Sequence, residues 1–351
     1  MMPFSYHKPA SVSEAVSLAG DSARFIAGGT NLVDLMKENV VRPERLIDIS
    51  GLALDGLHPT ANGGVMIGAL VSNADLAWHP MIEQQYPLLS QAILAGASPQ
   101  LRNMASTGGN LLQRTRCYYF YDTGTPCNKR EPGSGCPARS GRNRIHAILG
   151  ASEACVATHP SDMCVALAAL EAVVHVEGPA GKRQIPFADF HRLPENNPER
   201  DNQLAADELV TAVELPPPLF EQHYRYLKIR DRASYAFALV SVAAALRLDG
   251  DVIQHARLAL GGVAHKPWRD PAVESLLVGQ VPSEALFDNA AQALLQGAQP
   301  LSHNGFKVIL AQRAIVRALT DAAHRAAGGG HDHGQQQIGS RYPSGSRGWR
   351  G

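Results

Sequence analysis

All five cysteines of this 351-residue chain fall between residues 117 and 164. Cys117, Cys127, Cys136 and Cys155 lie in a stretch with little hydrophobic periodicity, whereas Cys164 lies in an apolar run typical of a helix. An odd number of cysteines in one cluster argues against a disulfide scaffold and favours metal ligation. The segment from residue 103 to residue 162 is therefore predicted to hold a bound inorganic centre.

Two turns rich in small residues precede the cysteines. Residues 23–27 are typical of a short buried strand, which runs into Gly28-Gly29-Thr30-Asn31 and then into helical spacing. Where a strand is followed by a double glycine and the start of a helix, free N–H groups converge and can bind a phosphate. A tight turn without a ligand is the alternative. The second turn covers residues 105–110. Neither turn matches a dinucleotide Rossmann fingerprint or a Walker loop.

The overall composition restricts the class of protein. The chain is 45% hydrophobic and 18% charged, as in ordinary globular proteins, and 32 basic residues balance 32 acidic ones. That balance predicts neither nucleic-acid binding nor attraction to an anionic membrane surface. No apolar run is long enough to be inserted across a bilayer. The first residues lack the apolar core of a secretory signal, which by itself favours the cytoplasm.

The length predicts at least two domains, and we place the boundary at Pro216-Pro217-Pro218. The predicted domains are residues 1–218, with the cysteine-bearing insert at about 113–156, and residues 219–327. Asp249-Gly250 is the strongest hairpin signal of the second domain. Residues 328–351 are rich in Gly, Gln, Ser and His and are predicted to form a disordered tail. The other expected elements of the second domain are a strand at 224–229, hairpin strands at 236–248 and 252–260, and helices at 271–278, 284–296 and 305–326.

Five motifs occur in a characteristic order: residues 27–32, Arg102-Asn103 with residues 106–111, Ser161-Asp162, Lys228, and Arg232. Together they resemble the FAD-binding subunits of molybdenum hydroxylases, a family that includes the flavin domain of xanthine dehydrogenase and the medium subunit of carbon monoxide dehydrogenase. The resemblance runs from about Phe4 to about Ala326. It implies an α+β fold: a two-subdomain FAD-binding domain of the PCMH type, followed by a C-terminal domain with a three-stranded antiparallel sheet and helices.

The cysteine insert is similar to that of the subset with an added [4Fe–4S] centre, as in 4-hydroxybenzoyl-CoA reductase. It resembles most the FAD subunit of bacterial periplasmic aldehyde oxidoreductases. A [4Fe–4S] cluster uses four thiolates, and we expect Cys117, Cys127, Cys136 and Cys155 as metal ligands with Cys164 left out. Nine, eight and eighteen residues separate successive ligands, whereas structural zinc usually shows closely paired cysteines. Seven basic residues accompany them and could offset cluster charge or simply form a solvated loop: Arg114, Arg116, Lys129, Arg130, Arg139, Arg142 and Arg144.

The resemblance also assigns FAD-binding positions. Gly28 to Leu32 would wrap the diphosphate with backbone N–H groups, and Thr107 to Asn110 would hold its other side. Asp162 would hydrogen-bond ribityl or ribose hydroxyls, unless it is only a first-turn helix charge. Lys228 would lie near the flavin edge, unless it is a surface strand lysine. The full predicted set is Ile26, Ala27, Gly28, Gly29, Thr30, Asn31, Leu32, Val33, Ser106, Thr107, Gly108, Gly109, Asn110, Asp162, Val210 and Lys228.

The function that the resemblance implies is electron transfer from iron–sulfur centres to FAD and on to an external acceptor, in a molybdenum-dependent aldehyde oxidoreductase. The implied partners are a [2Fe–2S] subunit and a molybdopterin-binding catalytic subunit, forming a heterotrimer. Export to the periplasm would use the small subunit's twin-arginine signal; the cytoplasm is the alternative location. No acid–base constellation is evident in the sequence. Two other functions stay open, namely a stand-alone flavoprotein oxidoreductase and a zinc-stabilised, non-catalytic binding module.

Overall fold

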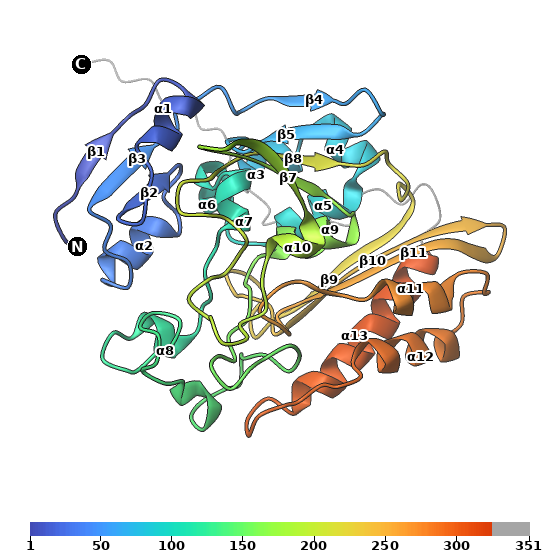
Figure 1. Ribbon diagram of the computed structural model, residues 1–351. Helices are drawn as coiled ribbons and strands as arrows, with labels where there is room; N and C mark the ends of the chain where they lie inside the picture. Colours follow the sequence, from blue (N-terminus) through green and yellow to red (C-terminus); the bar gives the residue numbers. More distant parts are fainter. Residues whose placement is uncertain (325–351) are drawn as a thin grey trace, which may run out of the picture.

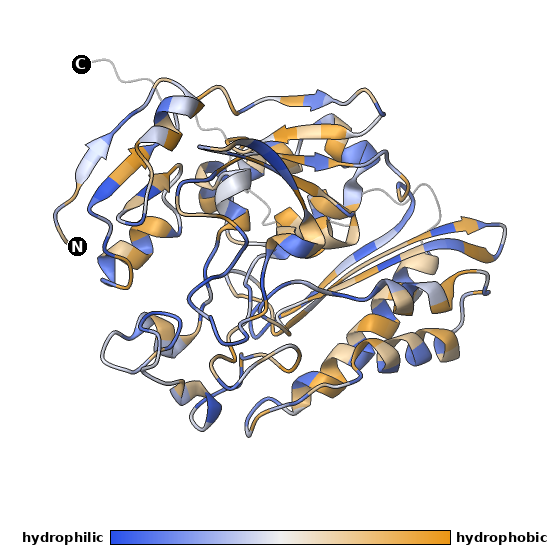
Figure 2. Ribbon diagram, viewed as in Figure 1, coloured by the Kyte–Doolittle hydropathy of each residue, from blue (hydrophilic) through white to orange (hydrophobic). Residues whose placement is uncertain are grey.

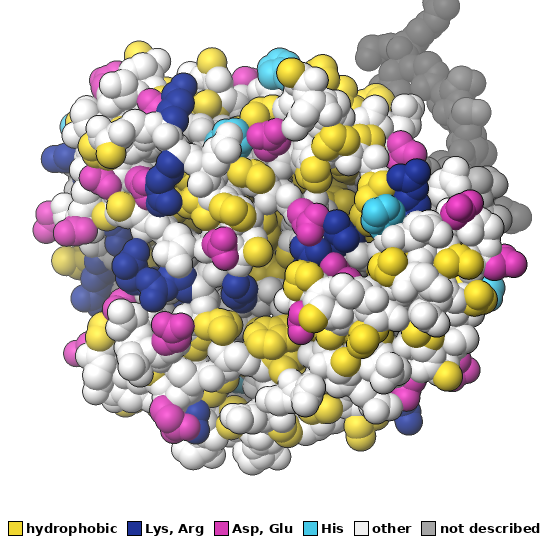
Figure 3. All heavy atoms as spheres, turned by 45° about the vertical axis from the view of Figure 1, so that its right-hand side comes forward, with side chains coloured by type: hydrophobic (Ala, Val, Ile, Leu, Met, Phe, Trp, Pro, Cys, Tyr) yellow, Lys and Arg dark blue, Asp and Glu magenta, His cyan; other side chains and the backbone are white. Residues whose placement is uncertain are grey.

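A computed structural model describes residues 1–324, which form three sheets (Figure 1). The predicted tail at 328–351 lies outside the described residues. Hydrophobic residues concentrate in the strands and helices, and hydrophilic residues in the loops between them (Figure 2). No helix within residues 1–324 combines the length and the apolar character needed to span a membrane. Charges of both signs are spread over the face drawn in Figure 3, with Lys and Arg gathered mainly on its left-hand side.

The N-terminal subdomain is a three-stranded parallel sheet of order β1-β3-β2. Ser11 caps its first helix, since its Oγ accepts from the Glu14 N–H at 3.2 Å, and the Glu14 carboxylate in turn accepts from the Ala10 N–H at 2.8 Å. The strand β2 leads directly into the first glycine turn, and α2 follows that turn. The elements are β1 (Ser5–His7), α1 (Val12–Ser17), β2 (Ala23–Ile26), α2 (Leu32–Lys37) and β3 (Arg45–Asp48).

The second subdomain is built on a five-stranded antiparallel sheet of order β4-β5-β8-β6-β7. All eight residues of α9 (Asp162–Ala169) are buried in its core, so this helix is a central packing element. The strands are β4 (Leu57–Pro59), β5 (Val65–Gly68), β6 (Val173–Gly178), β7 (Gly181–Pro186) and β8 (Leu209–Leu215). The remaining helices are α3 (Asn73–Ala77), α4 (Pro80–Gln85), α5 (Pro87–Ala95), α6 (Pro99–Met104), α7 (Thr107–Leu111) and α10 (Phe187–Phe190).

The C-terminal domain is an antiparallel sheet of order β12-β11-β10-β9, with helices packed against it (Figure 1). The predicted three-stranded sheet is present as three long strands, and the two-residue strand β12 adds a short fourth. Its strands are β9 (His223–Ile229), β10 (Val240–Asp249), β11 (Val252–Gly261) and β12 (Trp268–Arg269). Its helices are α11 (Pro271–Leu277), α12 (Glu284–Leu294) and α13 (Phe306–Ala323). The helices α5 and α9 of the preceding subdomain also contact this sheet.

The insert at residues 113–156 contains little regular structure: one helical turn, α8 (Tyr118–Tyr121), and a 3₁₀ turn, η1 (Pro137–Arg139). Turn hydrogen bonds hold the rest. The Asn128 N–H donates to the Gly135 carbonyl at 2.8 Å, and the Asn128 side chain accepts from the Gly135 N–H at 2.7 Å. The Arg130 guanidinium donates to the carbonyls of Tyr119 and Phe120. These hydrogen bonds add to a small buried hydrophobic cluster that includes Phe120, Ala138 and Val156.

Candidate functional site

A large cavity of about 820 Å³ lies where the N-terminal subdomain, the second subdomain and the strands β9–β11 meet. Six of the predicted FAD-binding residues line it: Thr30, Asn31, Gly109, Asn110, Asp162 and Lys228. The other ten predicted residues are not among its lining residues: Ile26, Ala27, Gly28, Gly29, Leu32, Val33, Ser106, Thr107, Gly108 and Val210. Residues of both predicted glycine turns thus meet at one cavity, although most residues of each turn do not line it.

Gly28 allows the two turns to approach each other. A Cβ at this position would lie 1.7 Å from the main-chain oxygen of Met104, at the end of α6. Gly29 adopts φ +71°, a left-handed conformation that favours glycine. These two requirements explain the glycine pair in terms of the molecule's own backbone, before any ligand is considered.

The second turn differs from the expected loop. Ser106 caps the short helix α7, since its Oγ accepts from the Gly109 N–H at 3.2 Å. The Thr107 and Gly108 N–H groups donate to the carbonyls of Val71 and Ala69 at 2.9 and 2.8 Å. These two N–H groups are engaged within the protein. Of residues 107–110, Gly109 and Asn110 line the cavity, and the expectation that residues 107–110 hold one side of the diphosphate stays a prediction.

Asn110 is the polar centre of this side of the cavity. Its amide donates to Asn73 Oδ1 at 2.6 Å, and its Oδ1 accepts from Ser161 Oγ at 2.5 Å and from Gln113 Nε2 at 2.9 Å. The amide is therefore held in one orientation by three neighbours. Asn73 could not be found from the sequence, because it lies in an ordinary helix, α3, with no motif around it.

Three residues that line the cavity each have a buried side-chain nitrogen without a hydrogen-bond partner: Asn31 Nδ2, Arg116 Nε and His159 Nε2. His159 Nδ1 accepts from the Ser161 N–H, so its proton is placed on Nε2. All three atoms are then donors. Buried donors without partners are costly unless a ligand satisfies them. The cavity is lined by polar residues and by apolar ones such as Ile93, Leu101 and Leu239, so a ligand with both polar and apolar parts, such as FAD, fits it.

Asp162 and Lys228 form a buried ion pair in the cavity wall. Lys228 Nζ lies 2.8 Å from Asp162 Oδ2 and also donates to the Ala95 carbonyl at 3.0 Å. Tyr226 donates its hydroxyl to Asp162 Oδ1 at 2.7 Å. Burial, with the charge of Asp162, raises the pKa of Tyr226 well above its usual value, so the phenol keeps its proton. The lysine is a buried residue of β9 and not an exposed strand lysine.

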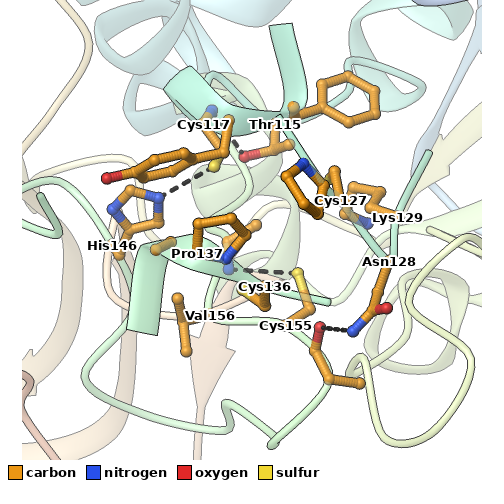
Figure 4. Close-up of a pocket in the computed structure, with 16 residues that line it drawn as sticks. Thr115, Cys117, Cys127, Asn128, Lys129, Cys136, Pro137, His146, Cys155 and Val156 are labelled. Atoms are coloured by element: carbon orange, nitrogen blue, oxygen red, sulfur yellow. Dashed lines mark hydrogen bonds between the residues drawn. The ribbon is translucent and has the colours of Figure 1, made fainter. Parts of the chain in front are cut away.

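A second, much smaller cavity is lined by the four predicted metal ligands, Cys117, Cys127, Cys136 and Cys155 (Figure 4). The structure contains no disulfide among them, and three of the four thiols are buried. Cys164 does not line this cavity; it is fully buried in α9, in the core of the second subdomain. The fold therefore brings the four insert cysteines together and keeps the fifth apart.

Burial and backbone N–H groups act in opposite directions on these thiols. Burial raises the pKa of Cys117 to about 12 and that of Cys155 to about 11. Backbone N–H groups act in the opposite direction, since those of Phe120 and Tyr119 lower the pKa of Cys117 and that of Ala157 lowers the pKa of Cys155. The cavity thus combines four thiols with backbone N–H groups directed at three of them, those of Cys117, Cys136 and Cys155.

His146 also lines the cysteine cavity, and its Nε2 lies 3.0 Å from Cys117 Sγ (Figure 4). Burial, together with the charge of Lys307, lowers the pKa of His146 to about 4, so its imidazole is neutral at pH 7. This residue was missed by sequence reasoning. The only signal available was a histidine within a cysteine-rich segment, and its contact with Cys117 spans 29 positions.

Among the seven basic residues of the insert, Lys129 alone lines the cysteine cavity. Its Nζ pairs with Asp201 at 2.5 Å. Burial on its own raises the pKa of Asp201, but Arg114, Lys129 and His265 together hold that pKa well below its usual range. Arg116 lies on the large cavity, Arg139 pairs with Glu153, and Arg144 pairs with Asp231. A general basic shell around the cysteines is therefore not what the structure shows.

The two cavities share a thin partition. Along residues 116–118, Arg116 and Tyr118 line the large cavity whereas Cys117 lines the small one. The same alternation occurs at Ile145 and His146. Single chain segments therefore separate the two cavities, and both residues that flank Cys117 lie on the large cavity.

The fold and the two cavities define an FAD-binding subunit of the molybdenum hydroxylase class. Residues 2–218 match the family described as FAD binding domain in molybdopterin dehydrogenase, and residues 223–322 match CO dehydrogenase flavoprotein C-terminal domain. The chain belongs to this family, which confirms the resemblance and the fold class inferred from the sequence. The family model supports FAD as a cofactor of this chain.

Individual relatives align over nearly the whole chain. The aldehyde oxidoreductase FAD-binding subunit PaoB of Escherichia coli is 52% identical, covering 93% of this chain and 100% of the relative. The glyceraldehyde dehydrogenase medium chain of Sulfolobus acidocaldarius is 29% identical, covering 92% and 97%. Among solved structures, the reconstituted CO dehydrogenase from Oligotropha carboxidovorans superimposes with a TM-score of 0.73 at 25% identity, covering 93% of this chain and 100% of that chain.

Proposed function

We propose that this chain is the electron-transfer flavoprotein subunit of a molybdenum-dependent aldehyde oxidoreductase. In this function it works with a [2Fe–2S] subunit and a molybdopterin-binding subunit. The supporting comparison is the 52% identity to an aldehyde oxidoreductase FAD-binding subunit over that relative's full length. FAD supplies the capacity to take up two electrons and to release them singly or in pairs. The chain's own residues bind and orient FAD: Asn31, Asn110 and His159 present polar groups to the cavity, and the Asp162–Lys228 pair holds its wall.

The proposal includes a [4Fe–4S] cluster held by Cys117, Cys127, Cys136 and Cys155. The observation that carries it is the convergence of these four thiols on one cavity, directly across a thin partition from the FAD cavity. Zinc is the alternative occupant of a four-cysteine site. The wide sequence spacing of the ligands and the adjacency to a redox cofactor both favour iron and sulfide over zinc.

The test is production of the chain together with its two partner subunits, followed by analysis of the purified complex. We expect FAD, iron and acid-labile sulfide, with four iron atoms per copy of this chain beyond those of the partner subunit. Stoichiometric zinc in place of that iron would contradict the cluster. Aldehyde oxidation by this chain alone, without molybdenum, would contradict the subunit role and favour a stand-alone flavoprotein.

We further propose a periplasmic location, reached by export of the assembled complex on a partner's signal. The alternative is the cytoplasm. Fractionation of cells that express all three subunits distinguishes the two locations, since only export places aldehyde-oxidising activity in the periplasmic fraction. Recovery of the whole complex from the cytoplasmic fraction would contradict the proposal.

A further inference from the structure

His146 occupies a position from which it can act on the proposed cluster without being one of its ligands. Its side chain is 1% exposed, and the partner of its Nε2 is the sulfur of Cys117, at 3.0 Å. Its Nδ1 is buried without a hydrogen-bond partner. Figure 4 shows the ring directed at Cys117 from the opposite side of the cavity to Cys127.

The hydrogen-bond direction follows from the chemistry of the sulfur. A cysteine sulfur bound to iron has lost its proton and can only accept a hydrogen bond. A proton on Nδ1 meets no acceptor, whereas Nε2 faces the sulfur and can donate to it whether the ring carries one proton or two. The proton therefore belongs on Nε2, where it points at Cys117.

The main chain of His146 is fixed from the C-terminal domain. Its carbonyl accepts from Lys307 Nζ at 2.8 Å and from Asn304 Nδ2 at 3.1 Å, and its N–H donates to the Asn143 carbonyl at 3.1 Å. Lys307 and Asn304 are both fully buried. The ring itself lies near Tyr118 and Tyr119, with centroid distances of 6.4 Å to each. Helix α13 and the insert therefore hold the imidazole in one orientation.

We propose that His146 donates a hydrogen bond from Nε2 to the Cys117 sulfur and thereby raises the reduction potential of the cluster. This inference rests on the cluster proposed above. Reduction adds one electron and makes the cluster more negative, so a donor on a ligand sulfur stabilises the reduced form more than the oxidised form. No proton moves in this step, and no bond is formed or broken. His146 is a positioning residue, because it acts through Cys117.

The hydrogen bond lies between the proposed cluster and the large cavity. Cys117 is flanked by Arg116 and Tyr118, which line the large cavity, and Ile145 beside His146 lines it too. The hydrogen bond thus lies on the side of the cluster that faces this cavity. A raised potential makes the cluster hold its electron more strongly, so the hydrogen bond limits how readily the cluster passes electrons to FAD.

The experiment is a potentiometric titration of the complete three-subunit complex, followed by the electron paramagnetic resonance signal of the reduced [4Fe–4S] cluster. Three variants are compared: His146→Leu removes the donor, His146→Gln restores an N–H at a similar reach, and His223→Leu is the control. His223 is a partly buried histidine of β9 whose Nδ1 contacts Ala322 O, away from both cavities.

We expect His146→Leu to raise the ratio of oxidised to reduced cluster about tenfold at a fixed ambient potential. For a one-electron couple this corresponds to a cluster midpoint about 59 mV lower than that of the wild type. His146→Gln should recover most of that shift, and His223→Leu should match the wild type. Iron content and the FAD midpoint should be unchanged. An unchanged cluster midpoint in His146→Leu would overturn the inference, as would loss of iron from that variant, which would make His146 necessary for assembly.

Iron and sulfide are measured on the wild-type complex first. Their absence there would overturn the proposed cluster and this inference together. Their presence with an unshifted midpoint in His146→Leu would overturn this inference alone.

Discussion

Lys228 Nζ lies 2.8 Å from Asp162 Oδ2 in the wall of the FAD cavity, and the two side chains are only 4% and 8% exposed. The pair joins β9 of the C-terminal domain to the first turn of α9 in the FAD-binding domain. Its two charges satisfy each other in a buried setting, and Tyr226 and the Ala95 carbonyl supply further hydrogen bonds. One interaction therefore links the cofactor cavity to the contact between domains.

Replacing Lys228 with Met should leave Asp162 buried and unpaired. Breaking a buried pair by removing one partner costs about 3–5 kcal/mol. We expect weaker FAD binding, measured by flavin fluorescence, and a lower midpoint of urea unfolding. The control is Lys228→Met combined with Asp162→Asn, which removes the unpaired charge and should recover much of the stability. Equal losses in the single and double variants would argue against the pairing as the cause.

Gly28→Ala should disrupt the approach of the two turns. The added Cβ would lie 1.7 Å from the Met104 main-chain oxygen, and backbone cannot move aside as a flexible side chain can. We expect loss of most bound FAD, measured as the ratio of flavin to protein after purification. The matched control is Gly305→Ala, where the added Cβ has no neighbour within 4 Å. Full flavin content in Gly28→Ala would show that the turns separate without cost.

The cysteine assignment predicts a sharp contrast between two serine variants. Cys164→Ser should retain full iron and sulfide, because this residue is buried in α9 and does not line the cysteine cavity. Cys155→Ser should lose or degrade the cluster, since it removes one of four ligands. Iron and sulfide analysis of both purified complexes gives the answer. The opposite pattern, with Cys164→Ser depleted and Cys155→Ser loaded, would mean that the fourth ligand is wrongly chosen.

Acid should destabilise the chain through its buried histidines. Burial lowers the pKa of His191 to about 4, whereas an unfolded histidine titrates near 6.5. The unfolded chain thus binds more protons between these values, and stability falls as the pH drops from about 6.5 towards 4. His191→Gln keeps a donor for the Leu111 carbonyl and removes this titration.

The free energy of unfolding of His191→Gln should fall less steeply over that pH range than that of the wild type. The difference should be on the order of a few kcal/mol, since one pKa unit corresponds to about 1.4 kcal/mol. Denaturant unfolding of both proteins at several pH values measures it. Identical slopes would mean that His191 does not carry the acid sensitivity.

Local sequence signals determined most of the secondary structure. Ser11, Ser72 and Ser283 are residues of the type that caps helices, and each side chain accepts from an N–H three residues on. The hairpin expected at Asp249-Gly250 joins β10 to β11. Caps and turns act within about four residues, so a short window of sequence contains the whole interaction.

The sequence by itself also determined the family, because five motifs in one order exceed what any single motif specifies. Tertiary structure alone decided which residues of those motifs face the cavity. The Thr107 N–H donates to the Val71 carbonyl, and the Gly108 N–H donates to the Ala69 carbonyl. Both acceptors lie far earlier in the chain. Asp162 meets Lys228 across 66 positions, and His146 meets Cys117 across 29. Such contacts depend on how separate segments pack, and no local periodicity encodes that packing.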